Sequence, residues 1–166
     1  REAYKAYFID SSETGFDHTL FRFLLNRLGV HKDSYAVEHC TGLFEKLPEE
    51  THTILNYFAS VQAIETVEED IVRFIQSDDA VYPYQIYQIV ELLCKEAENP
   101  SEELVAIVRR YAFDNASPAF LRSVSRQFLG RFGYVGDLER LEAIYALTGG
   151  PLDQGEIKYS QHVFGC

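Results

Sequence analysis

The stretch from Asp114 to Gly133 reads DNASPAFLRSVSRQFLGRFG and decides the fold class. A polar turn leads to Pro118, and proline is accepted in the first turn of a helix but not in its interior. After the proline, apolar residues recur at the spacing of one helix face. Arg122 and Arg126 lie one turn apart beside that face. The stretch predicts a helix that packs through one side and carries two arginines at its margin.

The same arrangement recurs along the chain. Pro48, Pro83 and Pro118 are separated by 35 and 35 residues. Three positions after these prolines the residues are Thr51, Ile86 and Leu121. Six positions after them they are Ile54, Ile89 and Val124, and ten positions after them they are Phe58, Leu93 and Phe128. These offsets mark one face of a helix, so the three segments are predicted to be copies of one helix.

The segments before the prolines also correspond. Ile71 to Arg73 recur as Ile107 to Arg109, and each copy leads to a polar turn that contains Asp79 or Asp114. Each unit is thus predicted to hold a first helix, a turn and a second helix.

Further units extend the pattern in both directions. Asp17 caps a second helix in LFRFLLNRLG, and the first ten residues supply its first helix. The first helix of a final unit is predicted after Gly136, in DLERLEAIYAL.

A fixed period with two helices per unit is typical of solenoids, in which each unit buries its apolar face against the next. We therefore predict an all-α fold, an α-solenoid of about four antiparallel helix pairs over residues 1–148, with a cap or tail at 149–166. An irregular helical bundle with accidental spacing is the alternative.

The opening stretch resembles a HEAT repeat. In that family the second helix follows an Asp-containing turn, carries an Arg after an aliphatic residue and ends in Leu-Gly; here Asp114, Arg122 and the pair Leu129–Gly130 occupy those positions. The resemblance implies that Asp114 and Arg122 have a structural role, bonding between neighbouring repeats. The segment from Pro83 lacks both the Arg and the Leu-Gly, so it departs from the pattern.

A second resemblance covers most of the chain. The order FDHTLFRFLLNRLG, LPEETHTILNYF, YPYQIYQIVELL and RRYAFDNASPAFLRSVSRQFLGRFG is similar to the helical region after the polymerase core of some bacterial reverse transcriptases, including those of phage-defence type. This resemblance implies an accessory C-terminal part of an RNA-directed DNA polymerase. The chain contains no Met, which also leads us to expect a fragment. The polymerase's aromatic-x-Asp-Asp motif is missing. The sequence has one Asp-Asp pair, Asp78–Asp79, and it follows Gln76 and Ser77, so the position that the motif requires to be aromatic is a glutamine.

Charge is unevenly distributed. The net charge is −11; residues 1–100 hold 18 acidic against 8 basic residues, whereas residues 101–145 hold 6 of each. An acidic chain is a poor general binder of phosphate backbones, so only a local arginine cluster would favour nucleic acid. The sequence has no apolar run that could span a membrane, and its three cysteines, an odd number, lead us to expect a cytoplasmic protein.

The sequence has few patterns that would indicate a catalytic, metal-binding or phosphate-binding site. The five histidines lack the close spacing of metal ligands, and no Ser or Cys has a base nearby in sequence, so we expect no catalytic residue, no metal and no cofactor. Gly130, Gly133 and Gly136 follow a helix rather than a strand, so they indicate helix termination instead of a phosphate loop.

Two sets of side chains remain as binding candidates. Phe74, Tyr82, Tyr84 and Tyr87 could stack nucleic-acid bases, but we expect them to fill the core and the spaces between helices. Arg109, Arg110 and Arg126 form the basic patch that we expect to contact a partner. That partner would be another protein, the remainder of a larger chain, or single-stranded nucleic acid; a generic protein-interaction scaffold without a nucleic-acid role is the alternative.

Overall fold

The protein is all-α in the part that the structure describes. The computed structural model describes residues 17–41, 43–77 and 82–148, and these ranges contain α-helices and short 3₁₀ turns but no β-strand. This confirms the all-α part of the predicted fold. Contacts divide the chain into two compact units, the first ending at Asp70 and the second beginning at Ile71. Within the described ranges, no helix combines the length and the apolar character needed to cross a membrane.

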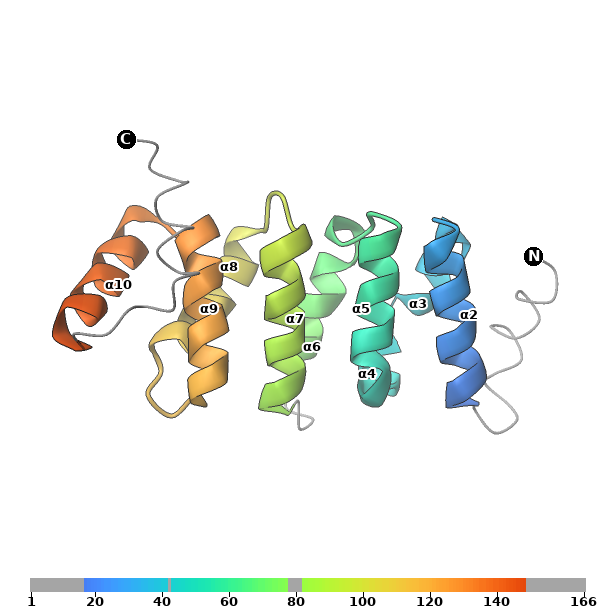
Figure 1. Cartoon of the computed structure of the whole chain (residues 1–166), viewed down its shortest axis with the longest axis horizontal. Helices are drawn as coiled ribbons and strands as arrows, with labels where there is room; N and C mark the ends of the chain where they lie inside the picture. The colour runs from blue at the N-terminus through green and yellow to red at the C-terminus, as the bar shows by residue number, and fades with distance from the viewer. Residues whose placement is uncertain (1–16, 42, 78–81, 149–166) are drawn as a thin grey trace. The chain divides into compact units, whose positions relative to one another are not determined.

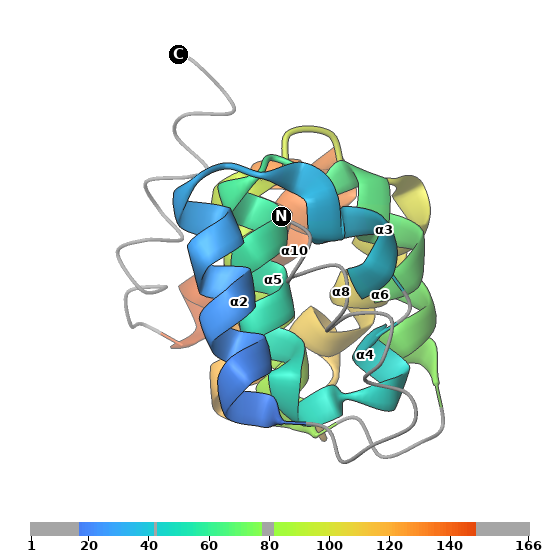
Figure 2. The same cartoon turned by 90° about the vertical axis from the view of Figure 1, so that its right-hand side faces the viewer.

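Unit 1 is built around two helices that lie side by side, α2 (His18–Val30) and α5 (Thr51–Ser60) (Figures 1 and 2). Gly29 allows their close approach, because a Cβ at that position would lie 3.2 Å from both Cβ and Oγ of Ser60. Short elements connect or follow the two helices: η1 (Ser34–Ala36), α3 (Val37–Cys40), α4 (Leu43–Lys46), η2 (Pro48–Glu50) and η3 (Glu65–Val67).

A buried tyrosine fixes the first of these connections. Tyr57 donates its hydroxyl to the carbonyl of Asp33 at 2.8 Å and accepts the backbone N–H of Ala36 at 3.1 Å. Burial raises the pKa of Tyr57 to about 12, so the hydroxyl stays protonated and keeps its donor role. The apolar core of this unit contains Phe21, Leu25, Phe44, Ile54 and Phe58, each at most 1% exposed.

Unit 2 is centred on α9 (Ala119–Phe132), which packs against three helices of the unit (Figure 1). These are α7 (Pro83–Glu96), α8 (Glu102–Phe113) and α10 (Val135–Thr148). A further helix, α6 (Glu68–Gln76), spans the point at which the two units divide.

The predicted packing face is confirmed position by position. The residues three, six and ten positions after each proline are 5% exposed or less in α5, α7 and α9, and the three at the tenth position are completely buried. The spacing in the sequence therefore identified the core-facing side of all three helices.

Helix ends agree only in part with the predictions. Asp17 caps α2 by accepting the backbone N–H groups of Thr19 and Leu20, and Pro83 is the first residue of α7, as predicted. Pro48, however, opens a 3₁₀ turn, and the α-helix begins at Thr51.

Glycine positions correct a second prediction. Gly130 lies buried inside α9 rather than at its end, and Gly136 lies inside α10. Only Gly133 ends a helix: its N–H donates to the Leu129 carbonyl at 2.7 Å, and a Cβ there would clash with that oxygen.

Several predictions fall outside the described residues. These are the first helix in residues 1–10, the Asp78–Asp79 turn and the tail at 149–166.

Candidate anion-binding site

Arginines from α8 and α10 line a pocket in unit 2. The pocket has a volume of about 440 Å³ and is lined by Arg109, Arg110, Phe113, Asp114 and Arg140. Four of these residues come from the end of α8 and its cap, and Arg140 comes from α10. Three guanidinium groups beside one carboxylate give the pocket a positive balance, in a chain whose net charge is −11.

Arg109 is held by an ion pair between the two helices. Its Nε and Nη2 donate to Oδ1 and Oδ2 of Asp137 at 2.5 and 2.8 Å. Asp137 also accepts the backbone N–H of Tyr134 at 2.9 Å, which satisfies a free donor at the start of α10. The Arg109 charge is thus largely neutralised, and the residue fixes α10 against α8.

The pKa values of this pair reflect their contacts. Burial alone would raise the pKa of Asp137, which is 6% exposed, but the hydrogen bonds from Arg109 and Tyr134 hold it below its ordinary value. The same carboxylate raises the pKa of Arg109. Both groups therefore stay charged at neutral pH.

Arg110 and Arg140 differ from Arg109 because no acceptor from the described part of the chain binds them. Both are exposed, and among the described residues neither side chain makes a hydrogen bond or an ion pair within 4.0 Å. The guanidinium carbon of Arg140 lies 4.0 Å from the centroid of the Phe113 ring. Stacking on a ring uses the face of a guanidinium and leaves the N–H groups at its edge free to donate. The charge of Arg140 also helps to lower the pKa of Asp137.

The predicted binding arginines are only partly brought together. Arg109 and Arg110 line the pocket, whereas Arg126 does not; its Nε donates to the carbonyl of Ala112 in the last turn of α8 at 3.1 Å. Sequence reasoning missed Arg140. No local pattern marks it, because its place beside Arg110 depends on how α10 packs.

Asp114 and Arg122 brace a turn rather than bridge neighbouring pairs. Asp114 accepts the backbone N–H of Ala116 at 2.9 Å, and Arg122 donates to the carbonyls of Asn115 and Ser117 at 3.1 and 2.5 Å. All of these bonds lie within the α8–α9 pair, which differs from the predicted bonds between repeats. The difference arises because both side chains find backbone partners in the turn between α8 and α9.

A different arginine links α9 to α7. Arg131, near the end of α9, donates to the carbonyls of Cys94 and Lys95 at the end of α7. It thereby satisfies carbonyls that a helix end leaves without a partner.

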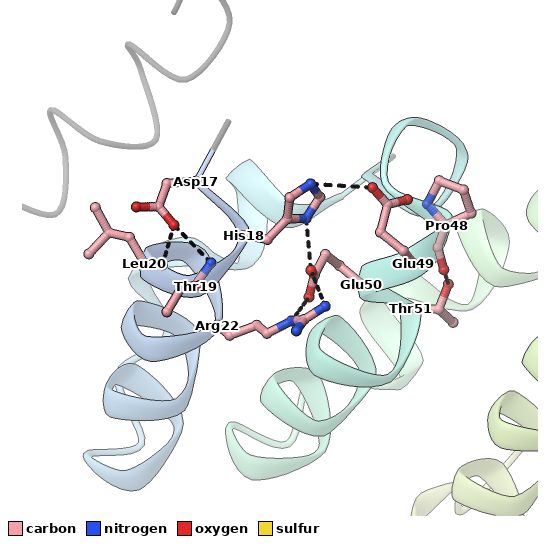
Figure 3. Close-up of polar contacts among 9 residues, drawn as sticks. All are labelled: Asp17, His18, Thr19, Leu20, Arg22, Pro48, Glu49, Glu50 and Thr51. Carbon is pink, nitrogen blue, oxygen red and sulfur yellow. Dashed lines mark hydrogen bonds and ion pairs between the residues drawn. The ribbon is translucent and has the colours of Figure 1, made fainter. Parts of the chain in front are cut away.

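Unit 1 contains a separate cluster of charged side chains (Figure 3). Glu50 is completely buried; Arg22 donates to its two carboxylate oxygens, each at 2.8 Å, and His18 Nδ1 lies 2.9 Å from Oε1. The other ring nitrogen of His18 lies 3.5 Å from Glu49.

The Glu50 carboxylate is fully used by these contacts. Burial by itself would raise its pKa, but hydrogen bonds from Arg22, His18 and Thr53 hold the pKa below its ordinary value. The cluster ties α2 to the start of α5, so we interpret it as a structural link rather than a binding site.

The buried cysteines and the acidic and histidine side chains of the described residues are further candidates for reactive or metal-binding groups. Cys40 and Cys94 are buried, and burial raises the pKa of each thiol to about 12, which disfavours the nucleophilic thiolate. Among the described residues, no group of three or more His, Cys, Asp or Glu side chains could hold a metal ion.

The aromatic side chains correct another prediction. Phe74 is buried as expected, but Tyr82 and Tyr84 are 68% and 60% exposed, and Phe120 is 46% exposed. Tyr82 and Tyr84 therefore do not fill the core. The first turns of α7 and α9 carry these exposed rings.

Comparisons of the chain with protein-family models, with curated proteins and with solved structures found no match. Function is therefore inferred from the residues of the chain itself.

Proposed function

We propose that the chain is a non-catalytic helical-repeat binding module that holds single-stranded nucleic acid on the arginines of unit 2. The observation that carries this proposal is the pair Arg110 and Arg140, two exposed guanidinium groups at one pocket to which none of the described residues offers an acceptor. Guanidinium edges match phosphate oxygens in charge and geometry. Arg109, already paired with Asp137, positions the two helices instead of binding the ligand.

The HEAT-like solenoid is part of the same proposal. Support comes from the 35-residue spacing and from the burial of equivalent positions in α5, α7 and α9. We further propose that the module is the accessory C-terminal part of a larger reverse transcriptase of phage-defence type, supported by the order of its helical segments. The coding sequence upstream of Arg1 tests this parentage: a polymerase core with an aromatic-x-Asp-Asp hairpin supports it, and an unrelated upstream domain refutes it.

Binding is tested by fluorescence anisotropy with a labelled oligothymidine at low and moderate salt, about 50 and 200 mM. The variant Arg110→Ala/Arg140→Ala is expected to bind more weakly and to lower the slope of log affinity against log salt by about 1.4, or about 0.7 for each phosphate contact. The single variant Arg27→Ala is the control, because Arg27 is exposed on α2 in unit 1. Absence of binding by the wild type, or an equal loss in the control, refutes the proposal.

A protein-interaction scaffold without a nucleic-acid role is the second candidate. The excess of 18 acidic over 8 basic residues in the first hundred positions favours it, since that surface repels phosphate. A pull-down that returns a specific protein partner, with the same yield after nuclease treatment, supports the scaffold. Loss of the partner after nuclease treatment contradicts it.

A further inference from the structure

Three aromatic rings form a contiguous cluster on α7 and α9. Tyr84 and Tyr87 are stacked with ring centroids 5.9 Å apart and an interplanar angle of 21°. Phe120 and Tyr87 meet in a T-shaped arrangement, with ring centroids 5.7 Å apart and an interplanar angle of 81°. Two of the rings, Tyr84 and Phe120, keep 60% and 46% of their surface exposed. Single exposed aromatics are ordinary, but a group of them from two helices is typical of an interaction surface.

The cluster lies close in the chain to the arginine pocket. Phe120 is the second residue of α9, and the turn at residues 114–118 joins that helix to the end of α8, where Arg110 and Phe113 lie. A ligand that carries both ring faces and negative charges therefore has partners at the start of α9 and the end of α8.

The charges beside the rings are compatible with bases rather than phosphates. Glu91 accepts a hydrogen bond from Tyr87, and burial together with that carboxylate raises the pKa of the Tyr87 hydroxyl. Lys95 lies 3.4 Å from Glu91 and offsets part of its charge. A phosphate would be repelled by Glu91, whereas an uncharged base would not, so phosphates are better placed toward Arg110 and Arg140.

We propose that the cluster of Tyr84, Tyr87 and Phe120 is a stacking platform for the bases of single-stranded nucleic acid. This inference rests on the proposed function of the arginine pocket, which supplies the phosphate contacts. Base faces are hidden in a duplex and accessible in a single strand, and aromatic side chains bind them with little dependence on sequence. The platform therefore gives the module its preference for single strands.

The test compares two labelled strands of equal length, oligothymidine and the same backbone without bases. The wild type is expected to prefer the strand with bases. Phe120→Ala is expected to weaken binding of oligothymidine about fivefold or more, to leave the salt slope unchanged and to abolish the preference. Phe23→Ala is the matched control, because Phe23 is 57% exposed in unit 1 and makes no ring contact among the described residues.

A conservative variant gives a spectroscopic readout that does not depend on an alanine substitution. The chain contains no Trp, so Phe120→Trp introduces a single indole at the platform. Its emission is expected to be quenched by oligothymidine and not by the strand without bases. Equal quenching by both strands, or no quenching at saturation, overturns the platform.

The outcomes separate this inference from the proposed function. If the wild type binds both strands equally and Arg110→Ala/Arg140→Ala still lowers the salt slope, the platform is refuted and the arginine site stands. If no strand binds, both are refuted. If Phe120→Ala and Phe23→Ala weaken binding equally, the rings at the start of α9 have no specific role and the platform is refuted.

Discussion

Removing the Asp137 carboxylate is expected to destabilise unit 2 by about 2–3 kcal/mol. The carboxylate accepts two hydrogen bonds from Arg109 and one from the backbone N–H of Tyr134, and Asp137 is 6% exposed. A hydrogen bond to a charged group contributes about 1.5–3 kcal/mol, and loss of a helix cap costs about 0.5–2 kcal/mol. Because the Arg109 side chain is 32% exposed, water can solvate it after the substitution. We therefore expect a total of roughly 2–3 kcal/mol, toward the lower end of the sum.

The measurement is urea unfolding of the full chain followed by circular dichroism. Asp137→Ala is compared with Glu139→Ala, which removes an exposed carboxylate from the same helix and should change the unfolding free energy by no more than about 0.5 kcal/mol. Asp137→Asn keeps an acceptor for Tyr134 but not the charge, so its loss should be intermediate. If the two units unfold in separate transitions, only that of unit 2 should shift.

A double-mutant cycle tests whether the loss belongs to the ion pair. Arg109→Ala combined with Asp137→Ala should be less destabilising than the sum of the single variants, because each single variant already breaks the pair. Additive losses, or an Asp137→Ala loss no larger than that of Glu139→Ala, would refute the reasoning.

Three further predictions concern other parts of the chain. Gly133→Ala should destabilise the protein, because the added Cβ meets the Leu129 carbonyl, whereas Gly136→Ala, with open space around its Cβ, should be neutral or stabilising in the same thermal unfolding experiment. Cys40 and Cys94 should resist a thiol reagent at pH 8 until the chain unfolds, because burial raises the pKa of each thiol to about 12. Mass spectrometry of each site measures this, and prompt labelling of the folded protein would contradict it. Glu50→Gln should be less stable than the wild type at neutral pH. Because the folded pKa of Glu50 lies below the ordinary value of about 4.3, the difference in unfolding free energy should narrow as pH falls through that folded pKa. A difference that is unchanged in acid would contradict this.

The buried faces of the helices could be predicted from the sequence because they follow from a simple repeat. The helical offsets after Pro48, Pro83 and Pro118 depend only on local geometry, and the residues at those offsets are buried. The helix ends were less predictable. Gly130 was expected to end α9, but the helix continues to Phe132, since glycine in a buried position can remain helical at a modest cost of about 1 kcal/mol.

The site was harder to predict from the sequence because its contacts join residues that lie far apart in the chain. Arg109 and Arg110 stand out as neighbouring arginines in a charge-balanced segment, but the pairing of Arg109 with Asp137 spans 28 residues. Which arginine is paired and which is free depends on the side of α10 that meets α8. The periodicity identifies a packing face but not its partner, so Arg140 and Asp137 could not be selected in advance.

The contact of Arg140 with the Phe113 ring distinguishes an arginine from a lysine of equal charge at this position. A flexible ammonium side chain loses most of its rotamer freedom when it engages a ligand, whereas a guanidinium already resting on a ring loses part of that freedom when the chain folds. Arg140→Lys would preserve the net charge and the long-range attraction, yet the ammonium would need to be ordered at the moment of binding. In the proposed complex, association would then remain nearly as fast while dissociation would be faster, so the ring contact would lengthen the residence time and leave the encounter rate unchanged.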